Sequence, residues 1–125
     1  MFVRRLELGG DELPFAGWAD VEGALAYLRA NEGITLLLEV TPETWYMDVF
    51  AAENDLWLVS VFHNGITSYL SNPRAPDDKY LELDIGGQLS AVSLRRFVDE
   101  ETVLRAVRTF FDTGLSDPAL PWETR

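Results

Sequence analysis

Three carboxylates, Asp48, Glu82 and Asp84, have the types and spacing best suited to chemistry. Glu82 and Asp84 are two positions apart in an alternating run, which places both on one face of a predicted strand. Asp48 and Glu39 belong to other predicted strands and are expected to lie near them. Paired carboxylates bind a divalent cation or act as general acid and base. Acids are also common on the solvated face of an antiparallel sheet, so a purely structural role is open too.

Composition excludes most other catalytic and metal-binding arrangements. The chain has no cysteine, which removes disulfides, thiol nucleophiles and cysteine-held zinc or iron–sulfur sites. His63 is the only histidine, so a multi-histidine metal site is excluded. The sequence has neither a glycine-rich phosphate loop followed by lysine nor a Gly-x-Ser-x-Gly elbow. Apart from the carboxylates, we expect no catalytic group, no metal ligand and no cofactor.

The charge balance favours a basic partner. The 125 residues include 21 acids and ten bases, a net charge of −11 with a pI near 4.3. Residues 31–94 hold ten of the acids and two of the bases. Direct binding of nucleic acid or of an anionic membrane needs a basic footprint, which the chain lacks. The acidic central block indicates either a basic protein partner or simply a well-solvated surface.

The elements that position these residues follow from hydrophobic periodicity and turn signals. One helix is predicted from its N-cap Asp20 to a stop at Gly33, and a second from its N-cap Asp99 to Gly114. Strands are predicted over residues 3–8, 34–40, 44–51, 56–62, 66–70 and 79–85, with 91–97 as a further candidate. Loops are expected over residues 11–18 and 72–78 and in most of the tail after 115.

Together these elements predict an α+β fold, an antiparallel meander of about five or six strands with two helices packed on one face. Residues 34–40 are apolar on both sides, which places their strand centrally. The whole chain, residues 1–125, is expected to form one domain. The lack of a membrane-length apolar run, and the charges within residues 3–7, favour a cytoplasmic location.

Aromatic residues cluster on the predicted strands. They are Trp45, Tyr46, Trp57, Tyr69 and Tyr80. Some are expected to pack against the helices, and the others to anchor an interface, where Trp and Tyr carry much of the binding energy. Tyr80 has the same strand parity as Glu82 and Asp84, so we expect its side chain to be exposed.

The C-terminal segment is the most distinctive part of the sequence. Residues 104–114 read LRAVRTFFDTG, and Pro118 and then Pro121-Trp122-Glu123 follow. This segment resembles the ending of the Imm1 family of bacterial immunity proteins. That ending is a helix that finishes in paired aromatics, then a short proline-bearing loop, then a Trp before an acidic residue. The chain also resembles one member of that family, the immunity protein of a double-stranded-DNA cytosine deaminase toxin. Over the rest of the chain the resemblance is architectural.

The resemblance implies a non-enzymatic inhibitor that forms a one-to-one complex with a toxin, and a Trp122 that folds the tail back onto the domain. A toxin acting on nucleic acid has a basic substrate cleft, which an acidic, aromatic-bearing surface can fill and exclude from substrate. The expected toxin-facing residues come from the acidic central block: Asp48, Glu53, Asp55, Asp77, Asp78, Tyr80, Glu82 and Asp84.

Two other functions remain open at this point. One is a small metal-binding module or enzyme built on Glu82, Asp84 and Asp48. The other is an adaptor for some other basic protein. Binding of divalent cations would separate the first from the rest, since tight binding that is lost in Asp84→Asn would indicate a metal site.

Overall fold

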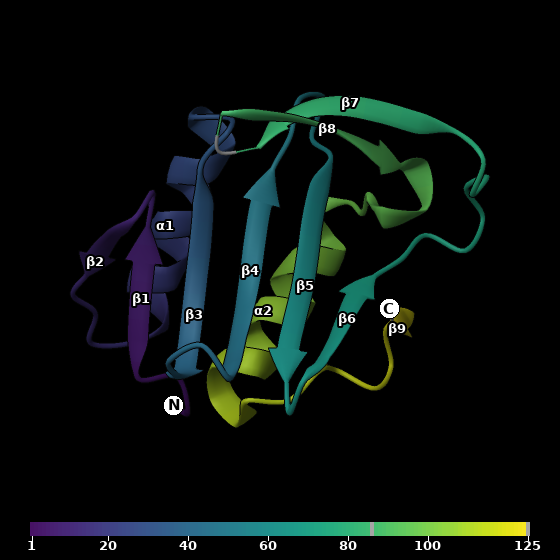
Figure 1. Cartoon of the computed structure of the whole chain (residues 1–125). Coiled ribbons are helices and arrows are strands. Elements are labelled where there is room, and N and C mark those ends of the chain that lie inside the picture. The colour runs from purple at the N-terminus through teal and green to yellow at the C-terminus, as the bar shows by residue number, and fades with distance from the viewer. Residues whose placement is uncertain (86, 125) are drawn as a thin grey trace.

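The computed structural model describes residues 1–85 and 87–124, and a large antiparallel sheet forms its centre (Figure 1). Seven strands lie in the order β2-β1-β3-β4-β5-β6-β9. Their bounds are β1 Arg5–Leu8, β2 Asp11–Leu13, β3 Thr35–Thr41, β4 Trp45–Ala51, β5 Trp57–His63, β6 Ile66–Leu70 and β9 Trp122–Thr124. The other elements are α1 Trp18–Ala30, β7 Tyr80–Ile85, β8 Gln88–Ser93, the 3-10 helix η1 Leu94–Arg96 and α2 Glu100–Thr113.

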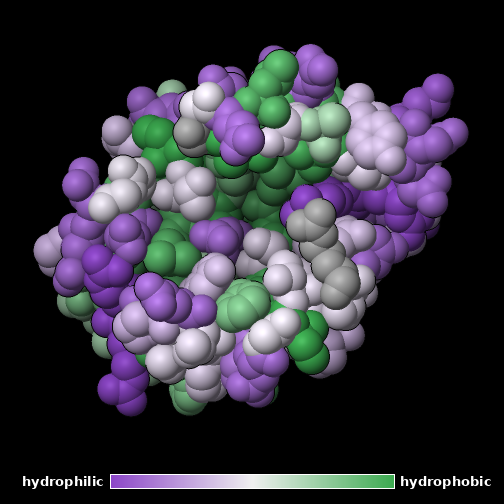
Figure 2. All heavy atoms as spheres, in the orientation of Figure 1, coloured by the Kyte–Doolittle hydropathy of each residue, from purple (hydrophilic) through white to green (hydrophobic). Residues whose placement is uncertain are grey.

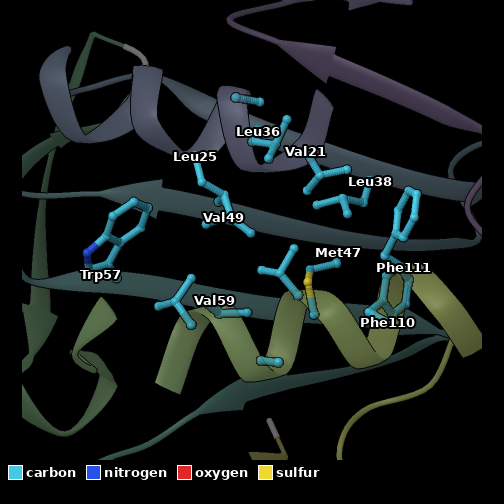
Figure 3. Close-up of a cluster of buried hydrophobic side chains, with 14 of the residues drawn as sticks. Val21, Leu25, Leu36, Leu38, Met47, Val49, Trp57, Val59, Phe110 and Phe111 are labelled. Atoms are coloured by element: carbon cyan, nitrogen blue, oxygen red, sulfur yellow. The ribbon is translucent and has the colours of Figure 1, made fainter. Parts of the chain in front are cut away.

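Strict alternation along β3, β4 and β5 explains why both helices pack on one face of the sheet. In the middle of these strands, every second side chain points to the helices and is almost fully buried (Figure 3). On the strands these residues are Leu36, Leu38, Met47, Val49, Trp57 and Val59. Val21 and Leu25 of α1 and Phe110 and Phe111 of α2 close the core from the other side. The predicted α+β fold is therefore confirmed, with both helices behind the sheet in Figure 1.

The second helix begins and ends as its sequence predicts. The Asp99 carboxylate accepts a hydrogen bond from the Thr102 N–H at 2.9 Å, which satisfies one of the free donors of the first turn. Gly114 follows the last turn with a left-handed backbone, at φ +73°. No helix in the described part of the chain is long and apolar enough to cross a membrane.

The first helix begins earlier than predicted. Its N-cap is Gly17, and Asp20 is the third residue of the first turn instead of the cap. From there the Asp20 carboxylate reaches back to accept hydrogen bonds from the N–H groups of Ala16 and Gly17, at 2.7 and 3.2 Å. These bonds hold the Asp20 pKa below its usual range. The acid was identified correctly as a stabiliser of the helix start, but at the wrong position.

The strand prediction of five or six was too low. The sequence predicts a loop for residues 11–13, but they form β2. This strand pairs with β1, and the glycine turn at residues 9–10 connects the two. The predicted strand 91–97 is wrong beyond Ser93, because the Ser93 hydroxyl accepts from the Arg95 N–H and starts a 3-10 turn. In the tail, β9 pairs with β6 and places Trp122 opposite Leu70. The Trp122 indole donates to the Asp117 carbonyl at 2.9 Å, so the tail does fold back.

The β7–β8 hairpin pairs with no strand of the large sheet in the described residues, and we call it the arm. It crosses one end of the face opposite the helices, which we call the open face (Figure 1). A second small core attaches it there: Phe50 and Leu58 of the sheet pack with Leu83 and Val92 of the arm and with Phe97. Figure 2 shows that the open face is hollowed below the arm, with hydrophobic side chains in the depth of the hollow.

We predict that Gly114→Ala lowers the free energy of unfolding by about 1 to 3 kcal/mol in chemical denaturation. An alanine there would have to keep φ +73°, and its Cβ would lie 2.5 Å from the Phe2 ring and 2.9 Å from the Trp45 ring. The matched control is Gly23→Ala at an exposed position of α1, where an added Cβ meets no atom within 4 Å. It should raise the unfolding free energy by about 0.5 to 1 kcal/mol. Equal effects would contradict this explanation.

Candidate functional site

The outer face of the arm carries three of the predicted contact residues. Tyr80, Glu82 and Asp84 alternate along β7 with the buried or half-buried Leu81 and Leu83, as the sequence predicts. Tyr80 is 62% exposed, which confirms the orientation expected for it. The exposed positions therefore form a row of one aromatic ring and two carboxylates along one side of β7.

An acid-rimmed pocket joins the arm to the large sheet. It has a volume of about 460 Å³ and is lined by Glu53 of the β4–β5 turn, by Glu82 and Asp84, and by Glu32 after α1. Phe50 and Leu83 are among its apolar lining residues. The structure thus brings together three of the predicted acids from separate elements. Sequence reasoning missed Glu32, which it placed in the signal that stops the helix.

The other predicted loop acids lie apart from this pocket. Asp55 is exposed in the β4–β5 turn and adopts φ +56°, and it lines a different hollow beside Asn72 and Asp99. Asp77 and Asp78 are exposed in the loop that leads into β7. The backbone carbonyl of Asp77 accepts a hydrogen bond from the Ser93 hydroxyl at 3.4 Å, which ties this loop to the arm. The arm and its loop therefore form one acidic surface, with Asp55 outside it.

The expected grouping of Asp48 and Glu39 with Glu82 and Asp84 is wrong. Asp48 and Glu39 lie on the open face of the large sheet, whereas Glu82 and Asp84 point outward from the arm. The reason is that, within the described residues, β7 pairs with β8 alone, so β3 and β4 do not pair with it. Within residues 1–85 and 87–124, no three or more histidine or acidic side chains are placed to hold a metal ion. The geometry gives the metal-site hypothesis no support.

Asp48 has an unusual environment for a carboxylate. The strand register places Leu37 and Ser60 on either side of it, and Tyr46 and Phe50 precede and follow it on the same face. Burial among these groups raises the pKa of Asp48 to about 6. No hydrogen bond or ion pair joins its carboxylate to another described residue. Burial and the Asp48 charge together also raise the pKa of the Tyr46 hydroxyl.

The other carboxylates of the open face are paired with arginines. Arg5 lies 2.7 Å from Glu7, 3.1 Å from Glu12 and 3.7 Å from Glu39. Arg95 pairs with Glu123 of β9. The Arg5–Glu39 and Arg95–Glu123 pairs were not predicted, because each joins residues that are far apart in the sequence.

Aromatic rings complete the open face. The Tyr46 and Phe62 rings stack at 5.4 Å between centroids, on neighbouring strands. The Arg96 guanidinium lies 4.7 Å from the centre of the Tyr69 ring. The predicted interface aromatics thus divide between the two faces, since Trp45 and Trp57 pack on the helix side. Period-two alternation along β4 and β5 was the signal that could have separated them.

The chain belongs to the Imm1 family of immunity proteins. The family model described as Immunity protein Imm1 matches residues 9–124, nearly the whole chain. This match confirms the family that the C-terminal segment predicted. Members of an immunity family neutralise a cognate toxin by binding it, and that is the role of this chain. No curated protein matches the chain well enough to be named as a relative.

We predict that Asp48→Asn stabilises the free protein at pH 8 by about 2 to 3 kcal/mol, from about 1.4 kcal/mol per pH unit. The folded-state pKa, about 6, lies above the ordinary value of 3.8, so the folded chain holds this proton more tightly. Wild-type stability therefore falls as the pH rises from 3.8 through 6, and the amide has no such titration. Urea denaturation from pH 3.5 to pH 8 measures the difference, which should vanish at the acid end.

Asp11→Asn is the matched control for this prediction. Asp11 is exposed on β2, in the same sheet but with the parity of the opposite face. Its substitution should change the unfolding free energy by less than about 0.5 kcal/mol at either pH. An Asp48→Asn variant no more stable than wild type at pH 8 would contradict the desolvation of Asp48.

Proposed function

We propose that the chain neutralises a toxin that modifies nucleic acid, a deaminase, by covering its active site with the acidic, aromatic-bearing surface of the arm. The observation that carries the proposal is the gathering of Tyr80, Glu82 and Asp84 with Glu53 on and beside one projecting hairpin. The deaminase assignment is supported by the resemblance of the C-terminal segment to an immunity protein whose toxin deaminates cytosine in double-stranded DNA. Asp77 and Asp78 extend the same surface.

The electrostatics of the arm suit such a target. An enzyme that binds nucleic acid holds its substrate with lysines and arginines, because each phosphate carries a negative charge. Acids that project on a hairpin attract that cleft over a Debye length of about 8 to 10 Å and speed association. Tyr80 then supplies a large contact area at low conformational cost. Occupation of the cleft excludes the substrate without any catalytic step by the inhibitor.

The remaining features of the proposal follow from this mode of action. The inhibitor acts as a stoichiometric binder, so it forms a one-to-one complex and needs neither a cofactor nor catalysis. The toxin threatens the cell that makes it, and its nucleic-acid substrate lies in the cytoplasm. We therefore place the protein in the cytoplasm, as a single domain of residues 1–125.

Co-expression with the toxin domain encoded immediately upstream, if one is there, tests the proposal. Cells that carry the toxin alone should die, and cells that also carry this chain should survive and yield a stable one-to-one complex. The purified toxin should deaminate single- or double-stranded DNA, and the complex should not. If there is neither rescue nor a complex, the proposal is wrong. Rescue from a toxin that has no nucleic-acid substrate would contradict the deaminase assignment.

We predict that the double variant Glu82→Lys with Asp84→Lys weakens toxin binding by at least about tenfold at 50 mM salt, mainly through a slower association rate. The loss should shrink at 500 mM salt, where screening is strong. Glu22→Lys with Glu43→Lys is the control with the same charge change, because both acids are exposed away from the arm. Surface plasmon resonance measures both rates. Equal losses in the two double variants would show that net charge, not the arm, determines the affinity.

A further inference from the structure

Asp48 is the one carboxylate of the open face that has no cationic partner among the described residues. Glu7, Glu12 and Glu39 share Arg5, and Glu123 has Arg95. The residues that flank Asp48 on its own face supply two hydroxyls, those of Ser60 and Tyr46, and otherwise apolar or aromatic surface. The open face thus has an unpaired negative charge in its middle row of side chains.

Such a charge is costly, because burial removes water that no protein group replaces. Asparagine or serine would fit the same position on β4 without that cost. An uncompensated, partly buried charge on a sheet face that no helix covers is the arrangement expected of a binding site, where an arriving cation restores the lost interaction.

The surroundings of Asp48 suit a long basic side chain. Figure 2 shows a hollow below the arm, lined in its depth by hydrophobic side chains. Leu37, Tyr46 and Phe62 are half-buried on this face, and the stacked Tyr46 and Phe62 rings lie one row below Asp48. Aromatic faces attract a guanidinium or ammonium group, and apolar surface accommodates the aliphatic stem that carries it.

We infer that the hollow of the open face receives a lysine or arginine side chain of the toxin, whose charged end pairs with the Asp48 carboxylate. This inference rests on the proposed function and adds a second contact to the arm. The arm attracts the toxin from a distance, and Asp48 holds one cation after docking. In a toxin that acts on nucleic acid, that cation is one that would otherwise bind a substrate phosphate. The carboxylate then occupies the place of the phosphate.

The test uses the intact chain and the upstream toxin domain, inactivated in its catalytic site, in calorimetric titrations. Asp48→Asn should weaken the complex about 10- to 100-fold, as expected for the loss of a charged partner in a hydrogen-bonded pair. Asp11→Asn on the opposite face should bind like wild type. Each lysine and arginine of the toxin's substrate cleft is then changed to alanine. For one of them the loss of affinity should disappear when the partner is the Asp48→Asn variant.

A second variant keeps the Asp48 carboxylate and supplies a cation from within the chain. Ser60 lies directly opposite Asp48 on β5, so Ser60→Lys would bring an intramolecular ammonium group to the same carboxylate. It should weaken toxin binding by at least about tenfold. Ala26→Lys on exposed α1 adds the same charge on the helix side and should have no effect. This pair tests the same contact without removing the Asp48 carboxylate.

The outcomes separate the inference from the proposed function. If wild type binds the toxin and both Asp48→Asn and Ser60→Lys bind equally well, the inference is wrong and the proposed function stands. If wild type does not bind the toxin, both are wrong. A loss in Asp48→Asn without coupling to any basic residue of the toxin would also overturn the inference.

Discussion

The fold depends on an unequal covering of the two faces of its sheet. One face of β3, β4 and β5 is apolar at alternate positions, except at His63, and is closed by two helices. Among the described residues, the arm and Phe97 cover one end of the other face by packing on Phe50 and Leu58. The apolar alternation thus produces both a stable core and a partly open surface. The acids and aromatic rings on that surface are available to a partner because no helix covers them.

We propose that the arm and the open face have different roles in binding a toxin. Glu82 and Asp84 are exposed, so we expect their charges to act through solvent and to affect association more than the strength of the final contact. Asp48 is desolvated and unpaired, so its charge acts at short range and strongly. The family membership supplies the partner, a toxin. A stability cost at Asp48 is consistent with a surface selected for binding, where function and stability compete.

Local patterns in the sequence predicted much of the fold and part of the surface. The bounds of β6, the caps of α2 and the outward direction of Tyr80 depend on neighbours within a few residues, and these predictions were confirmed. Strand pairing is not local. Nothing in residues 79–85 shows that β7 leaves the sheet, and nothing in the tail shows that Trp122 pairs beside Leu70. The sequence therefore could not show that Asp48 lacks a charged partner, because this depends on which strands lie beside β4.

Amide hydrogen exchange of the chain, free and bound to the upstream toxin domain, tests the central claim most directly. The account predicts that the toxin slows exchange in β7–β8 and in β4 and β5, which carry the arm surface and Asp48. Exchange in the exposed turns of α1 and α2 should stay unchanged, because both helices lie on the other side of the sheet (Figure 1). Protection confined to α1 and α2 would contradict the account, because the toxin would then bind the helices, on the side of the molecule opposite the arm.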